Sequence, residues 1–129
     1  MIGRMAHLGS VTVLVRDYDE AITFYVQALG FELVEDTPLD DGKRWVVVRP
    51  RDARETGLLL ARATGEQTAH VGNQTGGRVG WILNTTDFDG DHARMLAAGV
   101  VFDEVPRQEP YGKVAVFQDL YGNRWDLIG

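Results

Sequence analysis

The pattern of apolar and polar positions in the first half of the chain predicts the order strand, helix, strand, strand, strand. The β-branched run SVTVLV at 10–15 is typical of a buried strand. Asp17 or Asp19 can then cap a helix over 19–30, in which apolar side chains recur every three or four residues. The runs FELVED and RWVVVRP flank the turn residues Asp41 and Gly42 and predict a hairpin, and TGLLLAR predicts a further strand.

The second half repeats this order. Asp17-Tyr-Asp superposes on Asp87-Phe-Asp at an offset of 70, and the two predicted helices then end one residue apart. RVGWILNT, VVFDEV, KVAVFQD and RWDLIG are the predicted strands of this half. The polar, glycine-rich segment between the halves marks the module boundary. We therefore predict an α+β fold with two βαβββ modules, whose curved mixed sheets join in one continuous sheet around a cavity. The predicted single domain spans 1–129, with module 1 at about 8–63, a connector at about 64–77 and module 2 at about 78–129.

Composition narrows the functional classes. The 129 residues are 44% apolar and 25% charged, as in an ordinary globular domain. The absence of cysteine excludes disulfides and thiolate chemistry, and it fits a reducing compartment. A net charge of −6 without a basic face disfavours nucleic acid, and no apolar run is long enough to cross a membrane. We therefore expect a cytoplasmic protein that binds neither nucleic acid nor a membrane.

Two motifs carry a resemblance that covers nearly the whole chain. VRDYDEAITFYVQALGFEL near the start and FQDLYGNRWDLI at the end resemble the glyoxalase/bleomycin-resistance/extradiol dioxygenase superfamily, also called the vicinal oxygen chelate superfamily. The D-P-D-G-N turn usual in that family is written here as DLYGN, at 119–123. The resemblance implies the same fold, a small-molecule cavity, and a homodimer like that of the bleomycin-binding members.

Metal enzymes of this superfamily place four ligands on the cavity face. Counting from the repeated motifs puts these positions at Ser10, Gly80, Leu58 or Leu60, and Asp126. Asp126 is the one residue of this set with a side chain that binds divalent ions. One carboxylate does not hold a catalytic ion, so we predict no metal and no cofactor.

Strand alternation predicts which side chains face the cavity. Asp126 lies between Trp125 and Leu127, so it points away from the face that these apolar neighbours bury. Glu109 and Tyr111, in the loop EPYGK, are candidates for ligand contact at the pocket entrance, and His70 or His7 is a further candidate there. Two alternatives to a ligand pocket remain. These side chains could fill a closed core, or Asp126 could pair with Arg124. The predicted ligand-binding residues are Ser10, Thr12, Leu14, Leu58, Leu60, Gly80, Ile82, Asn84, Tyr111 and Asp126.

These residues favour a metal-free module that binds a small organic molecule, cationic or aromatic. The alternative is a lyase, isomerase or dioxygenase-type enzyme that uses Asp126 as its catalytic base or holds a non-standard metal site. A third possibility is a structural or regulatory subunit whose cavity has closed. The sequence leaves catalysis open, because a fold alone does not specify a reaction.

Overall fold

The structure is a computed structural model that describes residues 5–129. Residues 1–4, which the predicted domain includes, lie outside the described part. Module 1 contains four strands, and its helix begins as an α-helix and ends as a π-helical turn. In chain order its elements are β1 (Ser10–Val15), α1 (Tyr18–Thr23), the π-helix η1 (Phe24–Ala28), β2 (Phe31–Pro38), the 3-10 turn η2 (Asp40–Gly42), β3 (Arg44–Pro50) and β4 (Gly57–Arg62).

Module 2 follows a connector that holds a 3-10 helix, η3 (Gly65–His70). It repeats the order of module 1, with one short polar strand that the sequence pattern missed, β7. Among the described residues, no helix is long and apolar enough to cross a membrane. The elements of this module are β5 (Val79–Asn84), α2 (Phe88–Ala97), β6 (Val101–Phe102), β7 (Arg107–Glu109), β8 (Gly112–Gln118) and β9 (Arg124–Ile128).

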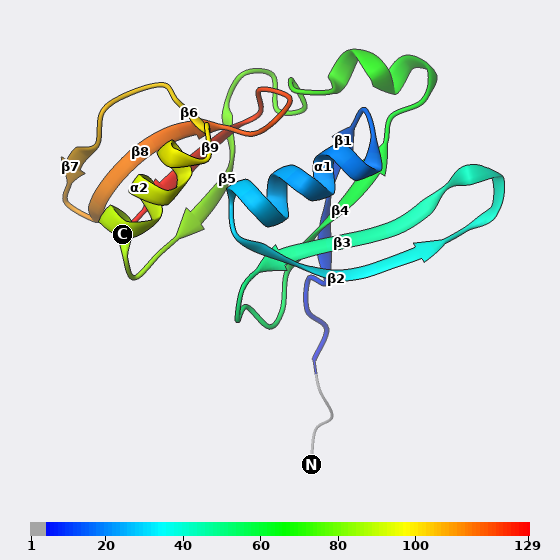
Figure 1. Cartoon of the computed structure of the whole chain (residues 1–129), viewed down its shortest axis with the longest axis horizontal. Coiled ribbons are helices and arrows are strands. Elements are labelled where there is room, and N and C mark those ends of the chain that lie inside the picture. Colours follow the sequence, from blue (N-terminus) through cyan, green and yellow to red (C-terminus); the bar gives the residue numbers. More distant parts are fainter. Residues whose placement is uncertain (1–4) are drawn as a thin grey trace.

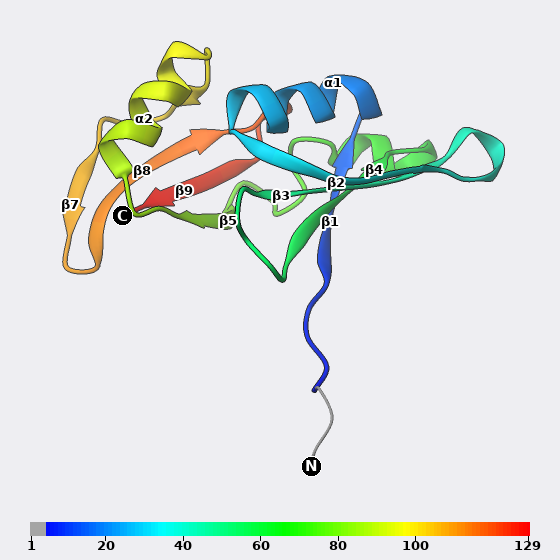
Figure 2. The ribbon, with the colours of Figure 1, turned by 60° about the horizontal axis from the view of Figure 1, so that its bottom comes forward.

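The strands form two mixed sheets, which confirms the predicted α+β class. The four-stranded sheet has the order β1-β4-β3-β2, and the five-stranded sheet has the order β5-β9-β8-β6, with β7 paired to β8. The prediction of one continuous sheet was wrong, because no described strand of one sheet pairs with a strand of the other. Helices α1 and α2 lie on the same side of the sheets (Figures 1 and 2). The opposite side carries no helix, and we call it the open face.

Both helices begin at the predicted aspartates. The Asp17 carboxylate accepts a hydrogen bond from the Glu20 amide at 2.9 Å, and the Asp87 carboxylate accepts one from the Gly90 amide at 3.1 Å. These bonds satisfy backbone donors that the first helical turn leaves free. Gly30 ends the first helix with φ at +75°, a conformation that glycine adopts without a steric penalty.

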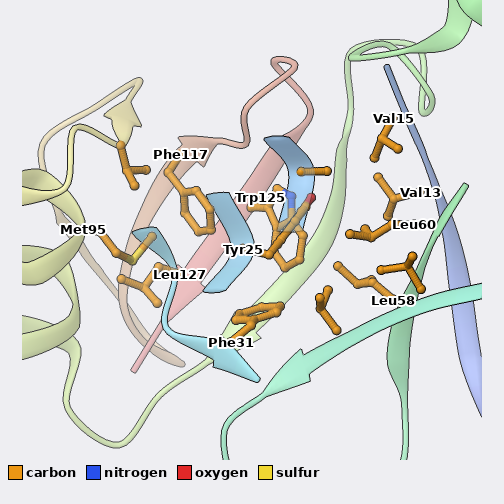
Figure 3. Packing of buried hydrophobic residues seen from close by; sticks show 14 of the residues in the cluster. Val13, Val15, Tyr25, Phe31, Leu58, Leu60, Met95, Phe117, Trp125 and Leu127 are labelled. Atoms are coloured by element: carbon orange, nitrogen blue, oxygen red, sulfur yellow. The ribbon is translucent and has the colours of Figure 1, made fainter. Parts of the chain in front are cut away.

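One hydrophobic core lies under both helices and draws on both modules. Tyr25 and Phe31 from module 1 pack against Trp125 from module 2, with ring centroids about 6.1 Å from that indole in each case (Figure 3). Val13 and Leu60 extend the core under α1, and both are fully buried. Apolar burial is therefore continuous across the boundary between the two sheets.

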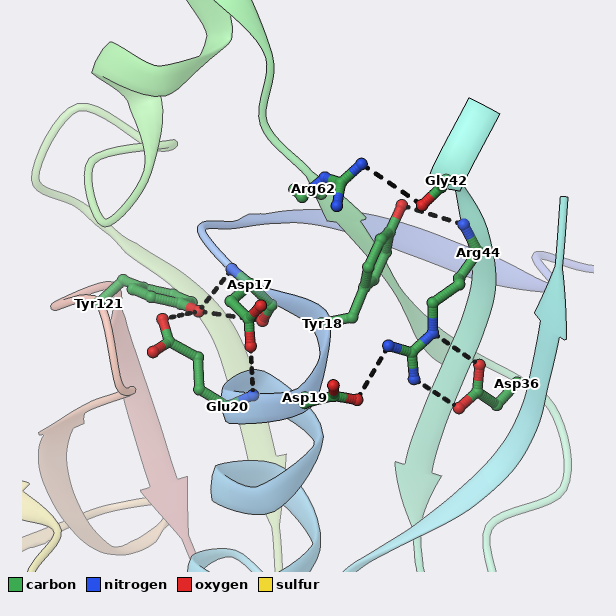
Figure 4. A network of polar contacts seen from close by, with 9 residues as sticks. All are labelled: Asp17, Tyr18, Asp19, Glu20, Asp36, Gly42, Arg44, Arg62 and Tyr121. Atoms are coloured by element: carbon green, nitrogen blue, oxygen red, sulfur yellow. Dashed lines mark hydrogen bonds and ion pairs between the residues drawn. The ribbon is translucent and has the colours of Figure 1, made fainter. Parts of the chain in front are cut away.

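Buried polar groups join the modules beside this core. The Asp119 carboxylate is 5% exposed and accepts hydrogen bonds from the Tyr25 hydroxyl at 2.8 Å and the Asn123 amide group at 2.9 Å. Nearer the surface, the Tyr121 hydroxyl donates to Glu20 at 2.7 Å (Figure 4). A buried carboxylate needs such partners, so the predicted DLYGN turn serves as a junction between the halves.

Candidate functional site

The open face of the second sheet brings Asp126 next to apolar side chains. Asp126 pairs in register with Ile82 on β5 and with Val116 on β8, so these three side chains share that face. Ile82 is 59% exposed, which is unusual for an isoleucine in the middle of a strand. Trp125 and Leu127 point into the core instead, as the alternation around Asp126 predicts.

Asp126 is a carboxylate that is partly removed from water. Its Oδ1 atom is buried and has no hydrogen-bond donor within residues 5–129. Burial raises the pKa of Asp126 above its usual value, the charge of Arg107 opposes this rise, and the charge of Glu104 adds to it. A positively charged ligand group at the accessible part of this carboxylate would therefore be favoured.

Three charged side chains form a cluster beside Asp126. Arg107 on β7 lies 3.1 Å from a Glu104 oxygen and 2.6 Å from a Glu109 oxygen. Hydrogen bonds with Glu109, Tyr111 and Glu104 raise the pKa of Arg107, which stays charged. Glu104 also accepts a hydrogen bond from the Val116 amide at 2.9 Å, which fixes the cluster to β8. With Asp126 included, carboxylates outnumber cations at this site.

Sequence analysis identified Glu109 and Tyr111 as candidates but missed Glu104 and Arg107. Glu104 lies in the loop between β6 and β7, where the sequence has no periodic pattern. The spacing of Arg107 and Glu109 was the available signal, because residues two apart in a strand share a face and opposite charges there can pair. Tyr111 lies in the turn between β7 and β8 and is 63% exposed.

The open face of the first sheet carries the predicted residues of β1 but not those of β4. Thr12 and Leu14 pair in register with Leu59 and Ala61, so these four side chains face away from the helices. The placement of Leu58 and Leu60 on that face was wrong. They pair in register with Val11 and Val13, and they are 7% and 0% exposed in the core under α1. A shift of one residue reverses the face of every side chain in a strand, and Leu59 takes the predicted position.

The remaining predicted residues separate into different surroundings. Gly80 lies at a bulge in β5, where a Cβ would come 2.7 Å from the Thr75 side chain, so close packing accounts for this glycine. Asn84 is exposed on the same face as Asp126. Ser10 pairs with Gly57 at the start of β1, on the face of Thr12. A hollow of about 200 Å³ between the modules has Leu58 and Ile82 in its wall.

The two candidate histidines lie apart from this face. His7 is exposed in the segment before β1, and His70 is exposed at the end of the connector helix η3. Within residues 5–129, no group of three or more histidine, aspartate or glutamate side chains is placed to hold a metal ion. At the family's ligand positions, Ser10, Gly80 and Leu59 offer no set of donors around Asp126. These residues do not fit a divalent cation, and no step of the chemistry below uses one.

Comparisons with known proteins identify the family. The model of the Glyoxalase/Bleomycin resistance protein/Dioxygenase superfamily matches residues 5–127. An uncharacterized protein of Shewanella frigidimarina (strain NCIMB 400) is 52% identical over 120 residues, which are 92% of this chain and 89% of that protein.

Solved structures agree with this match along nearly the whole chain. UcmS2 is 33% identical with a TM-score of 0.83, and the match covers 97% of this chain and 98% of UcmS2. TnmS3, an antibiotic binding protein from Streptomyces sp. CB03234, is 35% identical with a TM-score of 0.79, and the match covers 98% of each chain. The chain therefore belongs to the Glyoxalase/Bleomycin resistance protein/Dioxygenase superfamily.

Proposed function

We propose that this protein binds a small organic molecule on its open face, at Asp126, without a metal ion. The observation that carries the proposal is the buried Oδ1 atom of Asp126, which has no donor in the described part of the chain. An unpartnered carboxylate oxygen costs free energy, and a cationic ligand group at the accessible part of the same carboxylate offsets that cost. Ile82 and Val116 beside it supply apolar surface for the rest of the ligand.

The charges around Asp126 select the type of ligand. Glu104, Glu109 and Asp126 are three carboxylates, and Arg107 is the cation that lies among them. The local charge is negative even after the Arg107 ion pairs are formed, so a cationic group on the ligand is favoured. The ligand that fits is an amine or amidine attached to an apolar or aromatic body.

The similarity to TnmS3 supports the same class of function. TnmS3 is described as an antibiotic binding protein, and its chain matches this one from end to end at 35% identity. We therefore place an antibiotic-like compound first among the candidate ligands.

A ligand screen on the EDTA-treated full chain tests the proposal. The probes are bleomycin, the dicationic anthraquinone mitoxantrone, and an uncharged anthraquinone as a comparison. We expect at least one cationic probe to raise the melting temperature, and Asp126→Asn to weaken that binding about tenfold because a charge-assisted hydrogen bond is lost. Glu66→Gln, at an exposed connector carboxylate, is the matched control. The proposal fails if no cationic probe binds, or if Asp126→Asn and Glu66→Gln behave alike.

The raised pKa of Asp126 favours a second candidate function. A partly desolvated carboxylate is a stronger base than an exposed one, so Asp126 is suited to remove a proton in a lyase or isomerase reaction. The Asp126→Asn variant separates the two functions. If Asp126 is the catalytic base, the asparagine cannot replace it, so turnover falls by a factor of about 100 or more while the ligand still binds. A pure binding protein shows no turnover before or after the substitution.

Two further expectations belong to this proposal. We propose a homodimer, because Ile82 leaves 59% of its surface exposed on the open face, where a second chain can cover it. Light scattering that gives twice the chain mass supports the dimer, and a single chain mass contradicts it. We also propose a reducing compartment, the cytoplasm, which suits a chain without cysteine.

A further inference from the structure

A separate hollow lies where β3 and β4 move apart. These strands pair over three residues, from Val46 opposite Leu60 to Val48 opposite Leu58. Beyond Leu60, β4 stays with β1, whereas β3 stays with β2 and the hairpin leaves the sheet (Figure 1). The hollow has a volume of about 330 Å³, enough for a molecule of two or three rings. We call it the hairpin notch, and its wall includes Tyr18, Leu39, Lys43, Trp45, Leu59 and Arg62.

The hairpin notch contains three cationic side chains in a protein whose net charge is −6. Arg44 also lines it, but that side chain is already paired with two carboxylates, Asp36 at 2.7 Å and Asp19 at 2.9 Å. Arg62 and Lys43 make no ion pair with any carboxylate of residues 5–129, and Asp41 is the single acidic side chain in the wall outside the Arg44 pairs. Arg62 and Lys43 are therefore the two cations of the hairpin notch that can pair with an anionic group of a ligand.

Arg62 is held in position before any ligand arrives. Its guanidinium lies 5.3 Å from the centre of the Tyr18 ring, and its Nη2 donates to the Gly42 carbonyl at 3.3 Å (Figure 4). Arg44 lies 5.1 Å from the same ring centre, so Tyr18 is engaged by two cations. A guanidinium fixed in this way loses little conformational freedom when it binds an acid group.

Trp45 supplies an aromatic surface beside these cations. Its side chain is 43% exposed, and its ring packs against no other aromatic ring of the described chain. Leu59 and the 47% exposed Leu39 add apolar area to the same hollow. We infer that the hairpin notch binds a planar aromatic acid, with its ring on Trp45 and its acid group between Arg62 and Lys43. This site goes beyond the proposed function, because it is formed by other residues and selects the opposite charge from the surface at Asp126.

Titration of the full chain with 2-naphthoate tests this inference, and uncharged 2-naphthamide is the comparison. Calorimetry at low ionic strength is expected to give about tenfold tighter binding for the acid, because the acid gains charge-assisted hydrogen bonds from Arg62 and Lys43. Arg62→Gln and Lys43→Gln are each expected to reduce this preference at least threefold. Trp45→Leu is expected to weaken the acid and the amide together, because both use the ring surface.

Two controls assign the result to the hairpin notch. Arg78→Gln, at an exposed arginine directly before β5, and Asp126→Asn are expected to leave naphthoate binding within a factor of two. The melting temperature of each variant checks that it is folded, and Lys43 and Arg62 are exposed enough to be replaced without loss of the core. Equal binding of acid and amide, no binding of either compound, or a preference that survives both Arg62→Gln and Lys43→Gln would overturn the inference.

Discussion

Removal of one hydroxyl at the junction between the modules is expected to destabilise the whole fold. Tyr25 is 1% exposed and donates to the buried Asp119 carboxylate at 2.8 Å. Tyr25→Phe keeps the ring, which packs on Phe31 and Trp125, and deletes this donor alone. Asp119 keeps its hydrogen bonds from the Asn123 side chain and from the Tyr121 and Asn123 backbone amides. The carboxylate therefore loses one of its donors but remains hydrogen-bonded.

The expected magnitude follows from the type of bond. A hydrogen bond to a charged, buried acceptor contributes about 1.5–3 kcal/mol, so Tyr25→Phe should reduce the free energy of unfolding by about 2 kcal/mol. For a chain of 129 residues, an unfolding entropy of about 2.1 cal/mol/K per residue converts this loss into about 7 °C of melting temperature. Urea denaturation measured by far-UV circular dichroism gives the free energy directly.

Tyr121→Phe is the matched control for this measurement. Its hydroxyl bonds to Glu20 at 2.7 Å, but the side chain is half-buried and water can replace the lost partner. We therefore expect a loss below about 1 kcal/mol. Equal effects of the two substitutions, or a Tyr25→Phe effect below about 0.5 kcal/mol, would refute the reasoning that Asp119 depends on the Tyr25 hydroxyl.

Three more predictions concern the connector, the Asp126 carboxylate and the first helix. Gly72→Ala should lower the free energy of unfolding by more than about 3 kcal/mol, because φ is +79° and the new Cβ would lie 1.9 Å from the Tyr121 carbonyl oxygen. The control Gly76→Ala, at φ +67° in open space, should lower it by about 1 kcal/mol. Equal losses in urea titrations would contradict the close approach at Gly72. Asp126→Asn should stabilise the ligand-free protein at pH 7, by about 1 kcal/mol or less, and not at pH 3. Because the pKa of Asp126 is higher in the folded than in the unfolded protein, the folded state loses stability as the pH rises from one pKa to the other. Thermal unfolding that shows the stabilisation at pH 3 and not at pH 7 would contradict this prediction. Asp17→Ala should cost about 1 kcal/mol by removing the cap on the Glu20 amide, and an unchanged melting temperature would contradict that role.

Much of the fold could be predicted from local sequence pattern. The strands at 10–15 and 44–50 have the predicted bounds, because β-branched runs end there at residues typical of turns and caps. Both helix caps and the order of the two modules were also predicted, since Asp17 and Asp87 precede amphipathic runs. These features depend on neighbours in sequence, and such neighbours can be read without the structure.

The candidate site was less predictable, because its geometry depends on register. The run Gly57–Arg62 has three consecutive leucines and no alternation, so sequence cannot tell whether Leu58 or Leu59 faces the helices. The structure decides through the pairing of Val13 with Leu60. Trp45 also lies in a strand, and its 43% exposure follows from the departure of the hairpin from β4, which the sequence does not indicate.

The polar neighbours of Asp126 come together through a hairpin. Arg107 reaches the open face because β7 pairs with β8 from Arg107 opposite Val114 to Glu109 opposite Gly112. The segment RQE is polar throughout, and short polar strands carry no hydrophobic signal. Residues on such strands enter a site through long-range pairing, so the environment of Asp126 required the structure.

Amide chemical shifts of the EDTA-treated, isotopically labelled protein during titration with mitoxantrone test the central claim most directly. The account predicts saturable shifts that are largest at Ile82, Val116 and Asp126, with no divalent cation added, and a loss of affinity in Asp126→Asn. Shifts confined to the helix-covered side, binding that requires an added metal ion, or no shift at all would contradict metal-free binding at the open face.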